Sequence, residues 1–92
     1  MTSRTRVDEV LRFLGVDDPE LLALLRREGL FTEEELGPDE AEELRIATEL
    51  MRDLGVNAAG VEVALHMRRR LLVLERRVSV TLRQLLEERE AR

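Results

Sequence analysis

The sequence has no cysteine, no lysine and almost no aromatic residues. Without cysteine, the chain can form neither disulfides nor thiolate metal sites. Phe13 and Phe31 are the only aromatics, so the core must come from leucine, valine, alanine and methionine, which suits packed helices better than a sheet. No apolar run approaches the roughly 18 residues that cross a bilayer, and the N-terminal segment has no signal-peptide core. We therefore expect a cytoplasmic, all-α protein.

The charges are unevenly distributed along the 92 residues. Residues 1–60 hold 7 Arg and 15 acids, a balance of −8, and residues 61–92 hold 8 Arg and 5 acids, a balance of +3, which together give the net charge of −5. Hydrophobic residues make up 43% of the chain, enough for one small domain whose modest core a partner subunit would supplement. The acidic first part is a poor match for nucleic acid, because phosphates attract basic surfaces.

Glycines, prolines and capping residues predict the first two helices. The first helix is expected to begin at a Thr5 cap and to end at Gly15. The second is expected to begin at an Asp18 cap, with Pro19 in its first turn, and to end at Gly29.

The rest of the chain predicts a short turn and two longer helices. Thr32 and Glu35 have capping-box spacing, which indicates a single helical turn. A third helix is expected over residues 38–54, ending at Gly55. The last helix begins at an Asn57 cap and continues for about 33 residues, or roughly 50 Å. No strand of useful length is expected.

Heptad spacing in the last helix predicts a homodimer. Apolar residues recur in steps of three and four from Ala64 to Leu85. A small head can cover only the first third of such a helix, and the remaining stripe, if exposed, usually signals association. We therefore expect a head at residues 1–56 and a dimerisation arm at residues 57–92, paired in a parallel or antiparallel manner. The predicted interface consists of Met67, Leu71, Leu74, Val78, Leu82 and Leu85.

Several motifs resemble those of a known superfamily. The stretch "VDEVLRFLGVDDPELLALLRREGLF" resembles the start of MerR-type winged helix-turn-helix domains, in which a first helix ends in "LGV" and a second in "REGL". The stretch "LRIATELMRDLGVNAAGVEVAL" resembles the family's third helix and the turn into its fourth. Within the superfamily, residues 54–65 are most similar to the chaperone-modulatory, CbpM-like branch and to the heat-shock repressor HspR branch. The resemblance covers roughly residues 7–85.

The resemblance implies a MerR-like head, and the departures from the pattern suggest that its DNA-binding parts are lost. DNA-binding members carry aromatic and basic residues on the second helix and a basic wing after it. Here aliphatic residues replace the aromatics, and the fourteen residues between Gly29 and Leu44 include seven acids and no base. We therefore expect a wingless helix-turn-helix head that repels DNA.

CbpM-like members are described as binding the J-domain of a DnaJ-type co-chaperone. This binding regulates the work of the co-chaperone with Hsp70. Such J-domains present a basic helix, so an acidic surface could bind it. The resemblance thus implies a partner-binding surface in the acidic segment, although acids at a helix start can also be merely solvated. The expected docking residues are Glu33, Glu34, Glu35, Asp39, Glu40, Glu42 and Glu43.

The alternative function is a DNA-binding transcriptional regulator of the MerR or HspR type. Its possible contacts with nucleic acid, or with an acidic partner, are Arg26, Arg27, Arg68, Arg69 and Arg70. The last three residues could instead form the solvated flank of a coiled coil. His66 is the only histidine, so no metal-binding signature is present. We expect no enzyme activity, cofactor, metal or small-molecule substrate, because no catalytic pattern appears.

Overall fold

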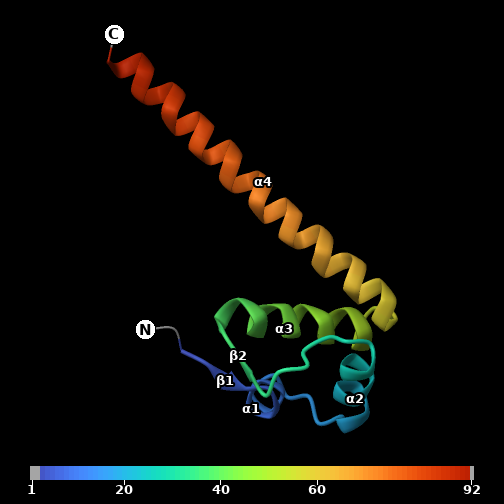
Figure 1. The fold of residues 1–92 in the computed structure, drawn as a ribbon. Helices are drawn as coiled ribbons and strands as arrows, with labels where there is room; N and C mark the ends of the chain where they lie inside the picture. The colour runs from blue at the N-terminus through green and yellow to red at the C-terminus, as the bar shows by residue number, and fades with distance from the viewer. Residues whose placement is uncertain (1–2, 92) are drawn as a thin grey trace.

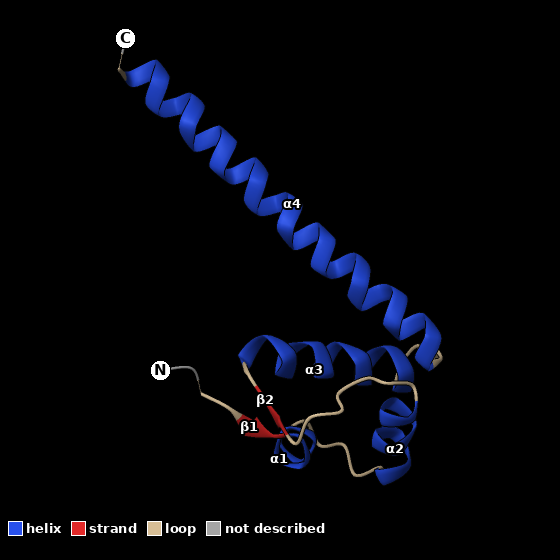
Figure 2. Ribbon diagram, in the orientation of Figure 1, coloured by secondary structure: helices blue, strands red, loops and turns tan. Residues whose placement is uncertain are grey.

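The computed structural model describes residues 3–91 as a small head from which one long helix projects (Figure 1). In chain order the elements are β1 (Thr5–Arg6), α1 (Val7–Phe13), α2 (Pro19–Arg27), β2 (Glu35–Leu36), α3 (Pro38–Arg52) and α4 (Ala58–Glu90). Figure 2 shows that helices dominate and that the two strands form one short pair. The prediction of a mostly helical fold with a long last helix is confirmed.

The start of α1 differs from the sequence-based expectation. Thr5 does not cap the helix, because it lies in β1, opposite Leu36 of the antiparallel strand β2. Arg6 takes the capping position, but its side chain does not accept a hydrogen bond from the first N–H groups of the helix. The first N–H of α1, that of Val7, donates instead to the carbonyl oxygen of Glu34 at 2.9 Å. The carbonyl group of a distant segment therefore accepts the hydrogen bond from an N–H group at the helix start, where a capping threonine side chain had been expected to accept one.

The segment before α3 is extended, and the predicted helical turn at Thr32–Glu35 is wrong. Glu35 and Leu36 form β2, and the side chain of Leu36 is buried in the head. The capping interaction lies further along the chain, where the N–H of Gly37 donates to the carboxylate of Glu40 at 3.5 Å. Local spacing could not reveal that this segment pairs with residues about 30 positions earlier.

The start and end of α2 agree with the sequence-based expectation. The carboxylate of Asp18 accepts hydrogen bonds from the N–H groups of Glu20 and Leu21, at 3.1 and 3.2 Å. Pro19 occupies the first turn, where its missing N–H costs nothing. Gly29 follows the helix with a φ of 82°, a left-handed conformation that glycine adopts without a steric penalty.

The main core of the head is aliphatic. It combines side chains from both short helices, from the connection between them, from β2 and from α3: Val7, Leu11, Val16, Leu21, Leu25, Leu36 and Leu44. Phe31 packs against this cluster from the loop after α2. Phe13 is 90% exposed, so only one of the two aromatic rings contributes to packing.

A tight corner joins α3 to α4. The α3 helix ends at Arg52, two residues before the expected end at position 54, and the side chain of Leu54 is 72% exposed. Asn57 caps α4 as predicted, with its side chain accepting from the N–H of Gly60 at 2.8 Å. A Cβ atom at Gly60 would lie 2.7 Å from Cγ1 of Val56, so the glycine allows the corner to pack closely.

A second buried cluster then joins the helices: Ala47, Val61 and Leu65.

The α4 helix leaves the head after its first turns. Its buried residues are Ala58, Val61 and Leu65, and every described residue from Arg69 onward is exposed. The radius of gyration is 17.4 Å, against about 12 Å for a compact domain of this length. The accessible surface of 7343 Å² also exceeds the roughly 5,500 Å² typical of a folded monomer of this mass. No helix in the described part of the chain is long and apolar enough to cross a membrane.

Candidate partner-binding groove

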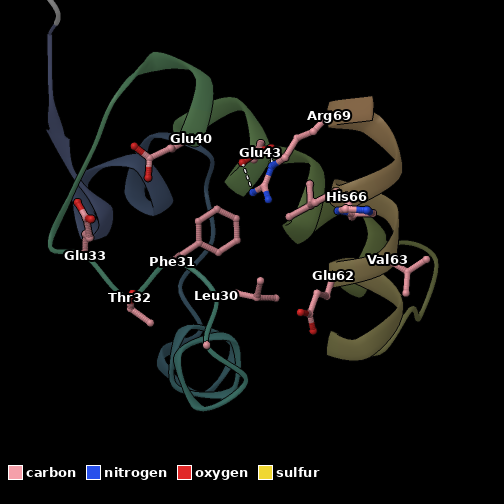
Figure 3. Close-up of a pocket in the computed structure, with 12 residues that line it drawn as sticks. Leu30, Phe31, Thr32, Glu33, Glu40, Glu43, Glu62, Val63, His66 and Arg69 are labelled. Carbon is pink, nitrogen blue, oxygen red and sulfur yellow. Dashed lines mark hydrogen bonds and ion pairs between the residues drawn. The ribbon is translucent and has the colours of Figure 1, made fainter. Parts of the chain in front are cut away.

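A groove of about 660 Å³ opens between the loop after α2 and the first turns of α4 (Figure 3). Its lining comes from the loop, from α3 and from α4: Gly29, Leu30, Phe31, Thr32, Glu33, Glu40, Glu43, Glu62, Val63, Leu65, His66 and Arg69. In Figure 3, Leu30 extends from the loop toward α4, and Glu62 extends from α4 toward the loop. The groove thus combines apolar side chains with several carboxylates.

Phe31 shapes the loop side of this groove. Its φ of 53° is the only positive value at a non-glycine residue in the described chain, and for a bulky side chain this conformation costs roughly 1–3 kcal/mol. The ring packs against both buried clusters, and Nε of Arg26 donates to the Phe31 carbonyl oxygen at 3.4 Å. These contacts hold the loop in a conformation that keeps the ring beside α3 and α4.

The lining of the groove includes an ion pair between α3 and α4. Nε and Nη2 of Arg69 donate to the two carboxylate oxygens of Glu43, at 2.7 and 2.8 Å. These hydrogen bonds raise the pKa of Arg69 above its ordinary value. Glu43 is only 6% exposed, and Nη1 of Arg68 lies 4.0 Å from its Oε2. The pair ties α4 to α3 at the point where α4 begins to project.

This ion pair changes the predicted set of docking residues. Glu43 does not belong to an exposed acidic surface, contrary to the expectation from the sequence, because Arg69 covers it. Arg69, which was expected to contact nucleic acid or an acidic partner, already binds a carboxylate of its own chain. The two residues are 26 positions apart, and no local motif links them, so the sequence carried no signal for the pairing.

Two other predicted docking acids also have partners within the chain. Glu33 binds Arg4 at 3.0 Å. Glu42 accepts a hydrogen bond from Nε of Arg45 at 3.0 Å, and this bond lowers the pKa of Glu42 below its ordinary value of 4.5. Within residues 3–91, the remaining four predicted acids form no ion pair: Glu34, Glu35, Asp39 and Glu40. They form the unpaired part of the acidic segment.

The other predicted arginines occupy two separate elements. Arg26 and Arg27 lie exposed in the last turn of α2, and Arg26 is engaged with the Phe31 carbonyl. Arg68 approaches Glu43. Arg70 lines a shallow hollow on α4 beside Met67 and Leu71.

The predicted dimer residues form an exposed stripe on α4, which we call the seam. Its six side chains are each between 50% and 64% exposed in the single chain: Met67, Leu71, Leu74, Val78, Leu82 and Leu85. At about 100° per residue, Met67 lies roughly 200° around the helix from Leu65. Because Leu65 packs into the head, the seam lies on the opposite side of α4, where the head does not cover it.

Within the described residues, no group of three or more histidine or acidic side chains is arranged to hold a metal ion. Comparisons of the chain with known protein families, with curated protein sequences and with solved structures give no match. The function is therefore inferred from the motifs of the sequence and from the geometry of the groove, the acidic segment and the seam.

Proposed function

We propose that this protein is a homodimeric chaperone modulator that binds the J-domain of a DnaJ-type co-chaperone and regulates its work with Hsp70. The observation that carries the proposal is the acidic surface of the head. Within the described residues its four unpaired carboxylates lie in one segment around β2 and the start of α3: Glu34, Glu35, Asp39 and Glu40. The motif resemblance supplies the partner class, because such J-domains present a basic helix. Opposite charges on the two surfaces would accelerate and orient their association.

The form of the head supports a wingless helix-turn-helix interpretation. Helices α1 and α2 are joined by a short connection, residues 14–18, and are followed by α3 and the corner into α4. The β1–β2 pair has only two residues per strand, which is too short to form a wing. Residues 28–37 contain no basic residue, so this part of the head has no side chain for gripping phosphates.

The seam supports a homodimer. Its heptad spacing matches a coiled coil, and the surface of the single chain exceeds that of a typical folded monomer by roughly 1,800 Å². A standard protein interface buries about 800 Å² on each partner. The projecting part of α4 therefore has ample surface for a stable interface with a second copy.

The DNA-binding alternative has weaker support. Arg26, Arg68 and Arg69 each interact with a group of their own chain. Phosphate contacts would have to replace these interactions, close to an acidic segment that repels DNA. A mobility shift on DNA at low salt would favour this alternative.

The proposal is tested by titrating a purified J-domain into the full chain in a calorimeter. We expect micromolar or tighter binding that weakens as salt is added, because the charges involved are exposed. We also expect the chain to change the rate at which the DnaJ-type protein stimulates ATP hydrolysis by Hsp70. An absence of binding at tens of micromolar would remove the proposal.

A further inference from the structure

The groove has an apolar and a charged component, and its α4 wall lies outside the acidic segment. Its lining includes four acids and one arginine, a formal charge of −4 + 1 = −3 with histidine neutral. Glu43 and Arg69 neutralise each other, and Glu33 binds Arg4. Glu40 on α3 and Glu62 on α4 remain, and neither forms an ion pair within residues 3–91. The groove therefore offers two negative charges from different elements: Glu62, and Glu40, whose carboxylate accepts only the capping hydrogen bond from the N–H of Gly37.

The apolar component lies between these carboxylates. Leu30 and Phe31 are partly buried; Leu30 extends from the loop toward α4, and the ring of Phe31 extends toward α3 (Figure 3). Their packing on the core, together with the hydrogen bond from Arg26 to the Phe31 carbonyl, holds them in place. A ligand that fits this groove must carry positive charge toward Glu40 and Glu62 and an apolar group toward Leu30 and Phe31. One face of a cationic amphipathic helix carries both.

We infer that the groove binds a cationic amphipathic helix of the partner protein, with Glu62 as a recognition residue that the acidic segment alone would not reveal. The inference rests on the proposed function only in taking the partner to be a protein with a basic helix. Apolar side chains of that helix contact Leu30 and Phe31, and its lysine or arginine side chains pair with Glu40 and Glu62.

The position of the groove allows the dimer to bind two such helices. Glu62 and His66 are one turn apart on α4 and line the groove, whereas Met67 of the seam lies about 100° around the helix from His66. Glu62 and His66 therefore lie on a different face of α4 from the seam, whereas Val63 of the lining lies within about 40° of Met67. Pairing through the seam leaves the groove of each subunit open.

The test compares two charge reversals on the same helix. Glu62→Arg places a positive charge in the groove, and Glu87→Arg makes the same change near the end of α4, away from the head. Both positions are exposed, so both variants are expected to fold. The probes are a purified J-domain and a synthetic amphipathic helix of lysine and leucine, each titrated into the full-length chain. We expect E62R to weaken the binding of both probes by about tenfold or more, and E87R to leave it unchanged.

The possible outcomes separate the groove from the proposed function. If the J-domain binds wild type and E62R equally, the groove assignment is overturned and the proposed function stands. If the J-domain does not bind but the synthetic helix binds in a Glu62-dependent manner, the proposed function fails and the groove assignment stands. If neither probe binds, both are overturned.

Discussion

At the scale of the residue, the buried carboxylate of Glu43 determines which group Arg69 binds. Its carboxylate is almost fully buried in the head, and desolvation of a charge is costly unless a partner binds it closely. Arg69 supplies that partner with two hydrogen bonds. The ion pair thereby ties the first projecting turn of α4 to α3 and neutralises one carboxylate of the groove lining.

Removing only the arginine of this pair should destabilise the fold. Arg69→Met leaves the Glu43 carboxylate buried, with only the more distant Arg68 nearby. We expect the free energy of unfolding to fall by about 1–3 kcal/mol. The loss is smaller than for a fully buried pair, because the side chain of Arg69 is largely exposed. Urea denaturation followed by circular dichroism measures the change.

Two further variants make this prediction specific. The double variant E43M/R69M should recover most of the lost stability, since an apolar pair no longer buries a charge. Arg70→Met changes an exposed neighbour and should alter stability by less than about 0.5 kcal/mol. If R69M were no less stable than R70M, the pair would not stabilise the junction between α3 and α4.

The ion pair of Glu42 predicts a pH effect. A hydrogen bond and the positive charge from Arg45 lower the pKa of Glu42 in the folded state. The Glu42–Arg45 pair therefore contributes to the stability of the fold above the ordinary pKa of 4.5. This contribution to stability is lost as the pH falls through the lowered pKa of Glu42 in the folded state. Arg45→Gln should return the Glu42 pKa toward 4.5, as measured by carboxyl-carbon NMR titration. A pKa unchanged in R45Q would rule out Arg45 as the cause.

At the scale of the element, the sequence predicted features that depend on neighbouring residues. The caps at Asp18 and Asn57 and the glycines that end α2 and α3 depend on nearby backbone, and the structure has all of them. The pairing of β1 with β2 connects segments about 30 positions apart, so neither the extended conformation of Glu35 nor the absence of a Thr5 cap could be read locally. The third helix was expected to reach Leu54 but ends at Arg52.

The candidate site was only partly predictable from the sequence, because some of its contacts join segments that are far apart in the chain. The acidic segment was visible as a run of charges, but two of its members pair with distant arginines, Glu33 with Arg4 and Glu43 with Arg69. The pair of Glu42 with Arg45, three positions later on α3, is local. The α4 wall of the groove was not predicted, because Glu62 and His66 meet the loop after α2 only in the folded chain.

The corner between α3 and α4 gives a prediction at this scale. Gly60→Ala should gain about 1 kcal/mol of helix propensity but lose more through the contact with Val56, since a Cβ atom would lie 2.7 Å from its Cγ1 and overpacking costs about 1–3 kcal/mol. We expect a net destabilisation of roughly 1 kcal/mol by thermal or urea unfolding.

A double-mutant cycle with Val56→Ala isolates this contact. In the V56A background, G60A should cost less than in wild type or become stabilising, because the opposing methyl group is gone. Equal effects of G60A in both backgrounds would show that glycine is not needed for close packing at the corner.

At the scale of the whole molecule, the chain separates two surfaces on one helix. The first turns of α4 close the head and border the groove, and the rest of the helix, which carries the seam, projects beyond the head (Figure 1). The longest dimension is 60 Å, most of which the helix accounts for at 1.5 Å per residue. The groove and the seam thus lie on separate parts of α4, as the proposed dimer with one groove on each head requires.

The seam can be tested with matched variants on α4. Leu74→Glu combined with Val78→Glu places charges on the seam and should convert the dimer to a monomer in sedimentation velocity at micromolar concentration. Val73→Glu combined with Val80→Glu introduces the same charges at apolar positions with similar exposure, but away from the seam, and should leave the dimer largely intact. A dimer that survives the first pair and is lost with the second would place the interface on another face of α4.

Light scattering on a chromatographed mixture of the full chain and a purified J-domain tests the central claim most directly. The chain has a mass of 10.6 kDa, so a dimer has a mass of 2 × 10.6 = 21.2 kDa. The account predicts one complex whose mass equals this dimer plus two J-domains. A chain that elutes as a 10.6 kDa monomer with the J-domain in a separate peak would contradict it.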